Sequence, residues 1–309
     1  MALVIIRNDD KTETWIRAIR EQAPDIPVFD YHKPHPRETV RMAGVWKHPS
    51  GSLGEYPGLL GVHGLGAGVD FILEDPGLPE NLPVLRVVDP FLAGDMAEYV
   101  LAQILSYLRQ LPRYTLDKAN RAWHPVSYAR IGDFRVGIMG LGTLGKAVAE
   151  LLVRAGFSVT GWTSHSRPQT GYTVFTGPEE KQAFLAGTDI LVCLLPLTPD
   201  TRGILNAETF DCLPGGTFLI NVARGPLLDE GALIRALDTG RLSGACLDVF
   251  STEPLPDAHP FWNHPSIQIT PHVASVSEPA SVAGQIIGNY RALLRGDSPE
   301  NQVSRLRGY

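Results

Sequence analysis

The chain has 309 residues, of which 44% are hydrophobic and 19% are charged, and its formal net charge is −6 at neutral pH. This length is typical of two domains, and the composition is typical of a folded globular protein rather than a disordered one. The acidic balance argues against a nucleic-acid surface, which needs a basic stripe, and no apolar stretch reaches membrane-spanning length.

The first residues of the chain are apolar, but the run is shorter than the apolar core of a signal peptide. Charged residues follow it at once, at Asp9, Asp10 and Lys11. We therefore expect a first β-strand rather than a secretory signal. The cysteines lie far apart, without zinc-ligand or CxxC spacing. They predict buried free thiols in a reducing cytoplasm and no metal site: Cys193, Cys212 and Cys246.

The N-terminal part alternates short apolar runs with polar, amphipathic stretches, and Gly or Pro follows each run. This βαβ pattern predicts a parallel sheet that is covered by helices. The predicted strands are 3–6, 28–29, 43–46, 59–62 and 84–87, and the first predicted helix is 13–21.

A long helix is predicted next, from Asp95 to Gln110, because apolar residues recur there at helical spacing. Asp95 is its expected N-cap and Pro112 its expected stop. Met96 on this helix is either a pocket neighbour or, more commonly for such a residue, part of the core. Residues 113–133 are poorly periodic and predict a long arm that carries Trp123.

A second βαβ series begins at Phe134. Its predicted strands are 135–139, 158–162, 190–194, 217–221, 244–248 and 267–270. A last helix is expected from Glu278-Pro279 to a stop at Gly296. We expect this helix to return to the first domain, which would then comprise residues 1–94 and 276–309, and the second domain would comprise 95–275.

A glycine-rich turn joins the strand 135–139 to a predicted helix at 146–155. In a strand–turn–helix context such a turn predicts a dinucleotide site, with the pyrophosphate at the helix N-terminus. The alternative is a set of packing glycines without a ligand. The turn comprises Gly140, Leu141, Gly142, Thr143, Leu144 and Gly145.

The strand after this turn lacks the acid that NAD-preferring folds place on the ribose 2′-hydroxyl. Thr163 stands at that position, and no Asp or Glu occurs from 151 to 178. Ser164, Ser166 and Arg167 can donate to a 2′-phosphate instead. We therefore expect a preference for NADP(H), with NAD(H) as the alternative if this loop does not discriminate.

Short strings along nearly the whole chain resemble the D-isomer-specific 2-hydroxyacid dehydrogenase family. They are LGAGVD at 65–70, GLGTLG at 140–145, LPLTPDT at 195–201, NVARG at 221–225, LDVF at 247–250, EPLP at 253–256 and TPHVAS at 270–275. Residues 46–49, Trp123 and residues 307–309 look closest to the glyoxylate/hydroxypyruvate reductase A branch. That branch often carries arginine where this chain has Ser164, which leaves Arg167 as the remaining candidate for the phosphate.

The resemblance implies an α/β fold with two Rossmann-like, doubly wound parallel-sheet domains. One is a flavodoxin-like substrate domain and the other an NAD(P)-binding Rossmann domain. It also implies an active site in the cleft between them, and a homodimer that forms largely through the cofactor domains. The expected partner is a small-molecule 2-keto acid, with no nucleic acid and no membrane.

The resemblance also assigns the catalytic residues. Arg224 matches the substrate-binding arginine, His272 the acid–base histidine, and Glu253 the carboxylate that pairs with it. This set suits the chemistry, because a guanidinium grips a carboxylate and a charged imidazole donates a proton to a carbonyl. Each residue alone has an ordinary structural reading, as a surface charge, a turn carboxylate or a core histidine.

Further contacts follow from the same strings. Beyond the turn and the 163–167 loop, the expected cofactor contacts are Leu195, Pro196, Thr201, Val222, Ala223 and Asp248, with Asp248 facing the nicotinamide carboxamide. The expected substrate contacts are Trp46, Leu65, Gly66, Ala67, Gly68, Arg224 and Ser275. Packing is the alternative for Trp46, and an ordinary loop is the alternative for 65–68.

The expected activity is NADPH-preferring reduction of glyoxylate or hydroxypyruvate to the D-2-hydroxy acid. Hydride would come from the nicotinamide and the proton from His272. Two alternatives stay open. One is the same chemistry on a larger, phenylpyruvate-type acid, and the other is a non-catalytic protein that senses a dinucleotide.

Overall fold

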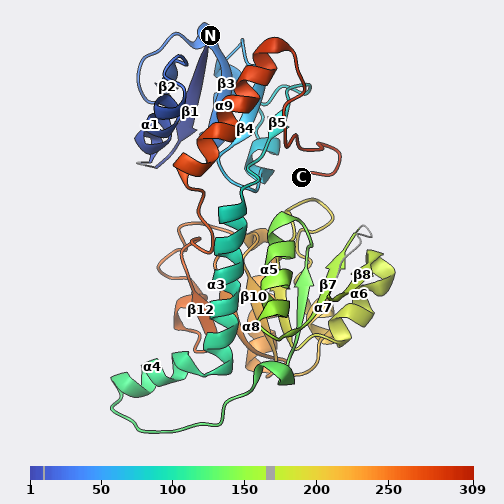
Figure 1. The fold of residues 1–309 in the computed structure, drawn as a ribbon. Helices are drawn as coiled ribbons and strands as arrows, with labels where there is room; N and C mark the ends of the chain where they lie inside the picture. The colour runs from blue at the N-terminus through green and yellow to red at the C-terminus, as the bar shows by residue number, and fades with distance from the viewer. Residues whose placement is uncertain (10, 165–170) are drawn as a thin grey trace. The chain divides into compact units, whose positions relative to one another are not determined.

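The computed structural model describes residues 1–9, 11–164 and 171–309, so Ser166 and Arg167 lie outside the described residues. The chain divides into two compact units. The first comprises Met1–Leu92 and Val276–Tyr309, and the second comprises Ala93–Ser275. Each unit contains one parallel sheet with helices, which confirms the predicted α/β fold class (Figure 1).

The sheet of the first unit has the strand order β2-β1-β3-β4-β5, which is the flavodoxin-like order. All its strand pairs are parallel. β1 is buried along its whole length, as its continuous apolar run predicts for a central parallel strand. The strands are β1 (Ala2–Arg7), β2 (Val28–Asp30), β3 (Val40–Trp46), β4 (Gly61–Gly64) and β5 (Val84–Leu85).

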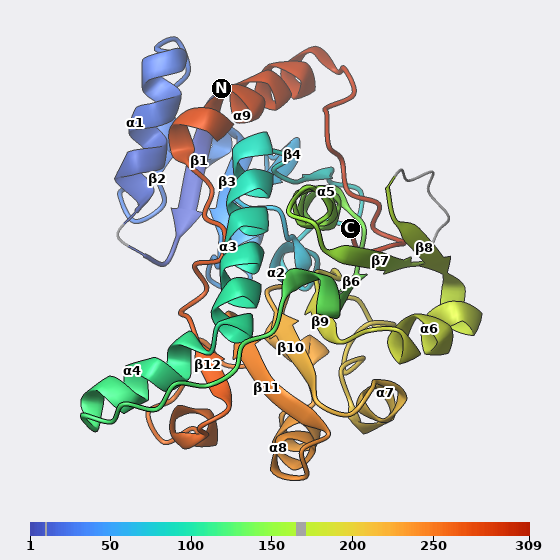
Figure 2. The same cartoon turned by 60° about the horizontal axis from the view of Figure 1, so that its bottom comes forward.

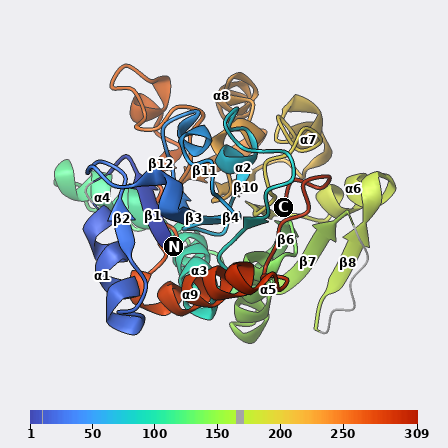
Figure 3. The ribbon, with the colours of Figure 1, turned by 90° about the horizontal axis from the view of Figure 1, so that it is seen from above.

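Helices from the two ends of the chain lie side by side in this unit (Figure 3). They are α1 (Thr12–Gln22) and α9 (Pro279–Arg295). Gln22 Nε2 donates to the carbonyl oxygen of Ala280 at 2.8 Å. α9 ends at Gly296, whose φ of 77° is left-handed, as predicted for a glycine stop. The shorter helices are η1 (Arg37–Thr39), η2 (Ser52–Glu55) and α2 (Asp70–Leu73).

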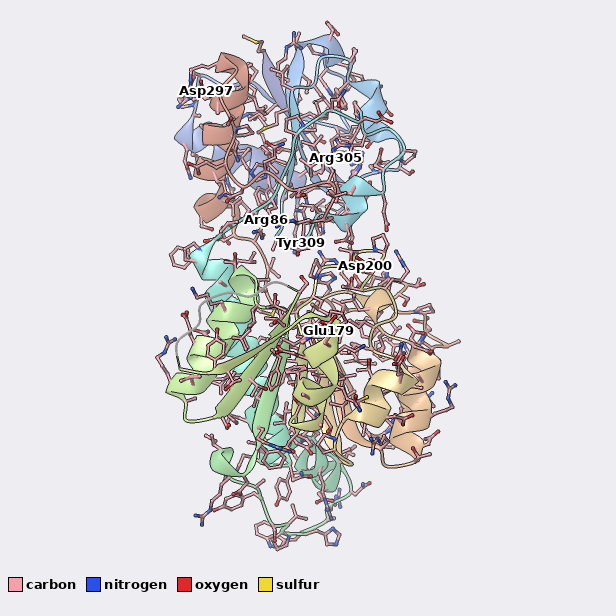
Figure 4. The ribbon with its side chains drawn as sticks, turned by 90° about the vertical axis from the view of Figure 1, so that its right-hand side faces the viewer. Arg86, Glu179, Asp200, Asp297, Arg305 and Tyr309 are labelled. Atoms are coloured by element: carbon pink, nitrogen blue, oxygen red, sulfur yellow. The ribbon has the colours of Figure 1, made fainter. Side chains whose placement is uncertain are left out.

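The last residues of the chain run along the edge of this sheet. Val303 N donates to the carbonyl oxygen of Val84 at 2.8 Å. The guanidinium of Arg305, labelled in Figure 4, donates to the carbonyl oxygens of Pro79 and Leu82. The C-terminal segment thus covers the edge that β5 would otherwise expose.

The sheet of the second unit has the order β12-β11-β10-β9-β6-β7-β8, and every pair is parallel (Figure 2). From β8 to β11 this is the Rossmann order, and β12 extends it. The strand order reverses between β6 and β9, where open α/β sheets bind ligands. The strands are β6 (Arg135–Met139), β7 (Ser158–Thr163), β8 (Thr173–Thr176), β9 (Ile190–Cys193), β10 (Thr217–Asn221), β11 (Leu242–Leu247) and β12 (Ile267–Ile269).

Helices cover both faces of this sheet. α3 (Pro90–Leu108) and α5 (Thr143–Arg154) pack on one face, and Met96 lies in that core, 5% exposed. α6 (Gly177–Ala186), α7 (Ala207–Cys212) and α8 (Glu230–Asp238) pack on the other. The 3₁₀ turns are η3 (Ile131–Asp133), η4 (Gly225–Leu227) and η5 (Pro260–Asn263).

Three sequence predictions need correction. α3 begins at Pro90, so Asp95 lies inside the helix and is not its N-cap. Pro112 stops nothing, because it stands in the first turn of α4 (Leu111–Ala119), where a missing N–H has no cost. The predicted arm therefore begins as a helix, which extends away from the sheet of its unit (Figures 1 and 2). Strand β8 was not predicted.

No helix in the described part of the chain is both long and apolar enough to cross a membrane. Cys193 and Cys246 are buried free thiols, as predicted, whereas Cys212 is only half-buried. Burial raises the pKa of Cys193 to about 12 and that of Cys246 to about 11.

Candidate active site

The glycine-rich turn follows β6 directly at the switch point of the second sheet. Gly140 has a left-handed φ of 101°, and a Cβ there would lie 2.7 Å from the carbonyl oxygen of Leu194. A Cβ on Gly145 would overlap the carbonyl oxygen of Gly140. The packing of the chain itself therefore requires these two glycines.

Gly142 is different, and it tests whether a dinucleotide fits. A Cβ on Gly142 would meet no atom of the chain within 4 Å. It is the N-cap residue of α5, whose first-turn N–H groups have no partner within the helix. These groups and the helix dipole suit an anion, and a pyrophosphate that approaches the backbone accounts for the missing side chain. Thr143 is exposed, and Leu144 is half-buried against the core.

The residues expected on the adenine side of the cofactor lie at the end of the next strand. Thr163 is the last residue of β7 and is 7% exposed, whereas Ser164 is exposed. The end of β7 thus carries two hydroxyl-bearing residues and no carboxylate.

A buried amide shapes the turn that carries Arg224. Asn221, the last residue of β10, is fully buried. Its Oδ1 accepts from Ala223 N at 3.2 Å, and its Nδ2 donates to the carbonyl oxygen of Arg224 at 3.1 Å. Arg224 is half-buried at the carboxyl end of this strand, where parallel sheets bind ligands.

Glu253 and His272 form the expected pair. His272 Nδ1 lies 2.8 Å from Glu253 Oε2, and the two side chains are 24% and 17% exposed. The other oxygen, Oε1, accepts from Phe250 N at 3.0 Å, which fixes the carboxylate. Because a carboxylate accepts the proton on Nδ1, Nε2 is the nitrogen that can exchange a proton with a substrate.

Asp248 holds the loop of the histidine. The backbone N–H of His272 donates to its carbonyl oxygen at 2.8 Å. Val273 N and Ala274 N donate to its two carboxylate oxygens, each at 2.9 Å. Asp248 is 1% exposed, so its carboxylate is committed to this loop. The expected contact with the nicotinamide stays a prediction.

The remaining expected cofactor residues lie in two segments. Thr201 Oγ1 donates to the carbonyl oxygen of Pro196 at 2.6 Å and accepts from Thr198 N at 2.8 Å, so this hydroxyl folds its own loop. The other three are buried: Leu195, Val222 and Ala223. The backbone of these residues is thereby fixed at the ends of β9 and β10.

The first unit brings Trp46 and Gly66 together. A Cβ on Gly66 would lie 2.7 Å from Cζ3 of Trp46, so the indole lies against a residue that has no side chain. Trp46 also meets Phe71 edge to face, with ring centroids 5.5 Å apart. His48 packs on the ring of Phe71 as well. His48 Nε2 contacts Asp75 Oδ2 at 2.9 Å.

The segment after β4 carries the other expected substrate residues. Leu65 is buried, and Ala67 and Gly68 are half-buried. The carbonyl oxygen of Gly66 accepts from Val87 N at 3.1 Å. Ser275 is the half-buried last residue of the second unit.

Some supporting residues were not assigned a role from the sequence. Asn221 and Phe71 belong to this group. A polar residue that ends the apolar run 218–220 is a signal that could have revealed Asn221. Among the described residues, His, Cys, Asp and Glu side chains do not gather in any group that could hold a metal ion.

The second unit combines a Rossmann-ordered sheet with a glycine-rich turn at its switch point. An arginine and a glutamate–histidine pair lie at the ends of its strands. Together these features define an NAD(P)-type dehydrogenase. The chain belongs to the D-isomer specific 2-hydroxyacid dehydrogenase family, whose NAD binding domain model matches residues 101–274.

Similar proteins extend this result to nearly the whole chain. A glyoxylate/hydroxypyruvate reductase A of Serratia proteamaculans is 42% identical over 302 residues, which are 96% of each chain. A D-isomer specific 2-hydroxyacid dehydrogenase from Xanthobacter autotrophicus, solved in complex with NADPH and MES, is 41% identical with a TM-score of 0.94, and the match covers 100% of this chain and 99% of that one. An NADPH-dependent glyoxylate/hydroxypyruvate reductase from Sinorhizobium meliloti, solved with NADP and sulfate, is 36% identical with a TM-score of 0.92 over 100% of both chains.

Proposed function

We propose that this protein is an NADPH-preferring reductase of small 2-keto acids, glyoxylate or hydroxypyruvate, and that its product is the D-2-hydroxy acid. The observation that carries the proposal is the 2.8 Å contact between His272 and Glu253, in the same unit as a dinucleotide turn. The names of the similar proteins from Serratia proteamaculans and Sinorhizobium meliloti support this substrate class.

When bound, the nicotinamide supplies the hydride for the keto carbon. Arg224 binds the substrate carboxylate, since a guanidinium matches its two oxygens. His272 donates a proton from Nε2 to the carbonyl oxygen, where negative charge develops. Glu253 accepts from Nδ1 and so fixes the direction of the imidazole. In the reverse direction the neutral imidazole accepts the hydroxyl proton.

The two units take different parts in this proposal. The dinucleotide-binding domain, 95–275, holds the cofactor through Gly140–Gly145, Thr163, Ser164, Leu195, Pro196, Thr201, Val222, Ala223 and Asp248. The substrate domain, 1–94 with 276–309, contributes Trp46 and the segment 65–68, and Ser275 is assigned to the substrate as well. Trp46 limits the size of the substrate, because Gly66 and Phe71 hold its ring.

The preference for NADP(H) rests on Thr163 and Ser164, which present hydroxyls and no carboxylate. The NADPH and NADP in the two similar structures support it. Arg167 and Ser166 are proposed phosphate contacts from the sequence alone.

A steady-state panel tests the whole proposal. Glyoxylate, hydroxypyruvate and phenylpyruvate are each measured with NADPH and with NADH. We expect the highest kcat/KM with a small acid and NADPH. Phenylpyruvate as the best substrate would overturn the substrate class, and equal or better use of NADH would overturn the cofactor preference.

We also propose a cytoplasmic homodimer that forms through the cofactor domain. Large apolar side chains are exposed along the arm that α4 begins, with Trp123 93%, Leu116 58% and Tyr128 58% exposed. A second copy of the chain would remove this apolar surface from water. Sedimentation equilibrium tests this, and a monomer at micromolar concentration would contradict it.

A further inference from the structure

A chain of hydrogen bonds links helix α3 to the loop of His272. The hydroxyl oxygen of Tyr99 on α3 lies 2.5 Å from Oγ1 of Thr270 and 3.5 Å from Sγ of Cys246. Oγ1 of Thr270 lies 2.5 Å from Oδ1 of Asp248. All four residues belong to the second unit.

The available proton donors allow only one direction for this chain of hydrogen bonds. An ionised aspartate only accepts, so Thr270 donates its single hydroxyl proton to Asp248. Thr270 must then accept a hydrogen bond from Tyr99, so the hydroxyl proton of Tyr99 is used in the bond to Thr270. Cys246 is left to donate its S–H to the tyrosine oxygen. Burial raises the pKa of the Tyr99 phenol and brings that of Cys246 to about 11, so both groups keep their protons at neutral pH.

The chain ends on the residue that fixes the catalytic loop. Asp248 accepts from three successive backbone N–H groups, those of His272, Val273 and Ala274. His272 itself has a left-handed φ of 56°, which a residue with a side chain rarely adopts. The conformation of His272 therefore depends on these bonds to Asp248.

We propose that Tyr99 is a positioning residue for His272. Its hydroxyl orients Thr270, Thr270 orients the Asp248 carboxylate, and Asp248 sets the loop so that the imidazole meets Glu253 and the substrate carbonyl in line. The role of Tyr99 in turnover rests on the proposed reductase function, whereas its role in ordering the loop does not.

A matched pair of variants tests this role. Tyr99→Phe keeps the ring and removes the hydroxyl. Tyr107→Phe makes the same change on the same helix, but the Tyr107 hydroxyl contacts Ser243 Oγ at 2.9 Å and is no part of the chain to Asp248. We expect Tyr99→Phe to lower kcat by about tenfold, below the ~100-fold cost of a 1 Å misplacement. KM and the Kd for NADPH should change less than about twofold, as expected when ground-state binding is kept.

Thr270 supplies the internal check. Thr270→Ser keeps a hydroxyl and should retain most of kcat, whereas Thr270→Val, of similar shape, should lose as much as Tyr99→Phe. The double variant Tyr99→Phe/Thr270→Val should lose little more than either single one, since the two act in series. Additive losses, or equal kcat for Tyr99→Phe and Tyr107→Phe, would overturn the proposal.

Hydrogen exchange gives a readout that does not depend on activity. In the full-length protein, backbone amides of the peptide that spans 270–275 should exchange about tenfold faster in Tyr99→Phe and unchanged in Tyr107→Phe. Unchanged exchange in Tyr99→Phe overturns the inference. If the exchange result is as expected while the wild type reduces no 2-keto acid, the proposed function fails and the positioning of the loop stands.

Discussion

A Cβ on Gly225 would overlap the backbone carbonyl of Phe250. Gly225 directly follows Arg224, and the N–H of Phe250 donates to Glu253. The loop that carries Arg224, the proposed substrate-binding arginine, therefore lies in backbone contact with the loop that orients Glu253. Only glycine permits this approach.

Substitution of Gly225 should therefore separate the two loops. We expect Gly225→Ala to lower kcat/KM by about tenfold to 100-fold, the range in which small misplacements act. Gly215→Ala is the control, because a Cβ at Gly215 meets nothing within 4 Å. Steady-state kinetics and thermal melts of both variants provide the measurement, and a fully active Gly225→Ala would contradict the contact.

Gly142 should respond differently from the other glycines of its turn. Gly142→Ala should leave the melting temperature of the cofactor-free protein unchanged, because the added Cβ meets no atom of the chain. The Kd for NADPH should rise by about tenfold or more, which is about 1.4 kcal/mol. Fluorescence titration checks this, and unaltered NADPH binding would show that no pyrophosphate approaches Gly142.

The histidine pair carries the proton transfer in the proposed reaction. His272→Asn removes the group that donates the proton, so kcat should fall about 100-fold to 10,000-fold while NADPH still binds. Glu253→Gln keeps the shape of the side chain but removes the charge that accepts from Nδ1, so its kcat should fall as well. Steady-state kinetics and a fluorescence titration with NADPH provide the measurement. A His272→Asn variant that keeps nearly full kcat would remove His272 from its role.

Trp46 should control substrate size. Trp46→Leu should raise the ratio of kcat/KM for phenylpyruvate over glyoxylate by about tenfold, within the range that a change in apolar pocket volume gives. Trp162→Leu is a tryptophan control in the second unit, where the indole donates to the carbonyl oxygen of Gly177. If Trp46→Leu and Trp162→Leu changed the ratio of kcat/KM for phenylpyruvate over glyoxylate equally, a specificity role for Trp46 would be contradicted.

His63 should make the stability of the first unit depend on pH. It lies in β4, fully buried, and this burial lowers its pKa from 6.5 to about 4. The unfolded chain therefore binds more protons between these values, so stability is fully present above about pH 6.5 and is lost as the pH falls toward 4. The loss is at most about 3 kcal/mol, from 1.36 kcal/mol per pKa unit.

Urea unfolding at pH 7 and pH 5 measures this loss. His63→Met removes the titrating group and should flatten the dependence. An equal slope in both proteins would assign the acid sensitivity to other groups.

The sequence predicted those parts of the fold that depend on local chemistry. The strand bounds 135–139 and 217–221 agree with β6 and β10 residue for residue, because both strands are apolar and end at a turn. Pro112 was predicted to end a helix, but it stands in the first turn of the next helix. Proline is common at both places, so the residue alone does not distinguish them. β8 escaped prediction because it is a short edge strand that is only partly buried.

At the site, too, the sequence reveals local features and not long-range contacts. Arg224, Glu253 and His272 stand in recognisable strings, so roles could be proposed for them from the sequence alone. The bonds that hold them come from segments far apart in the chain, as with Tyr99 and Thr270. Asp248 is an example. The cofactor contact expected from its string stays a prediction, whereas the bonds of its two carboxylate oxygens to the loop after β12 became known only from the structure.

The edge segment that carries Val303 has a consequence for synthesis of the protein. The second unit is one continuous stretch, whereas the first is completed only by α9 and the residues that pair with β5. On the ribosome, residues 1–92 emerge before the second unit, yet their helix partner and edge cover emerge after it. The cofactor-side unit can therefore fold while the first sheet still exposes the apolar face that α9 covers. Aggregation of nascent chains should thus depend on this sheet, and chaperone binding should persist until the segment that carries Val303 has left the ribosome.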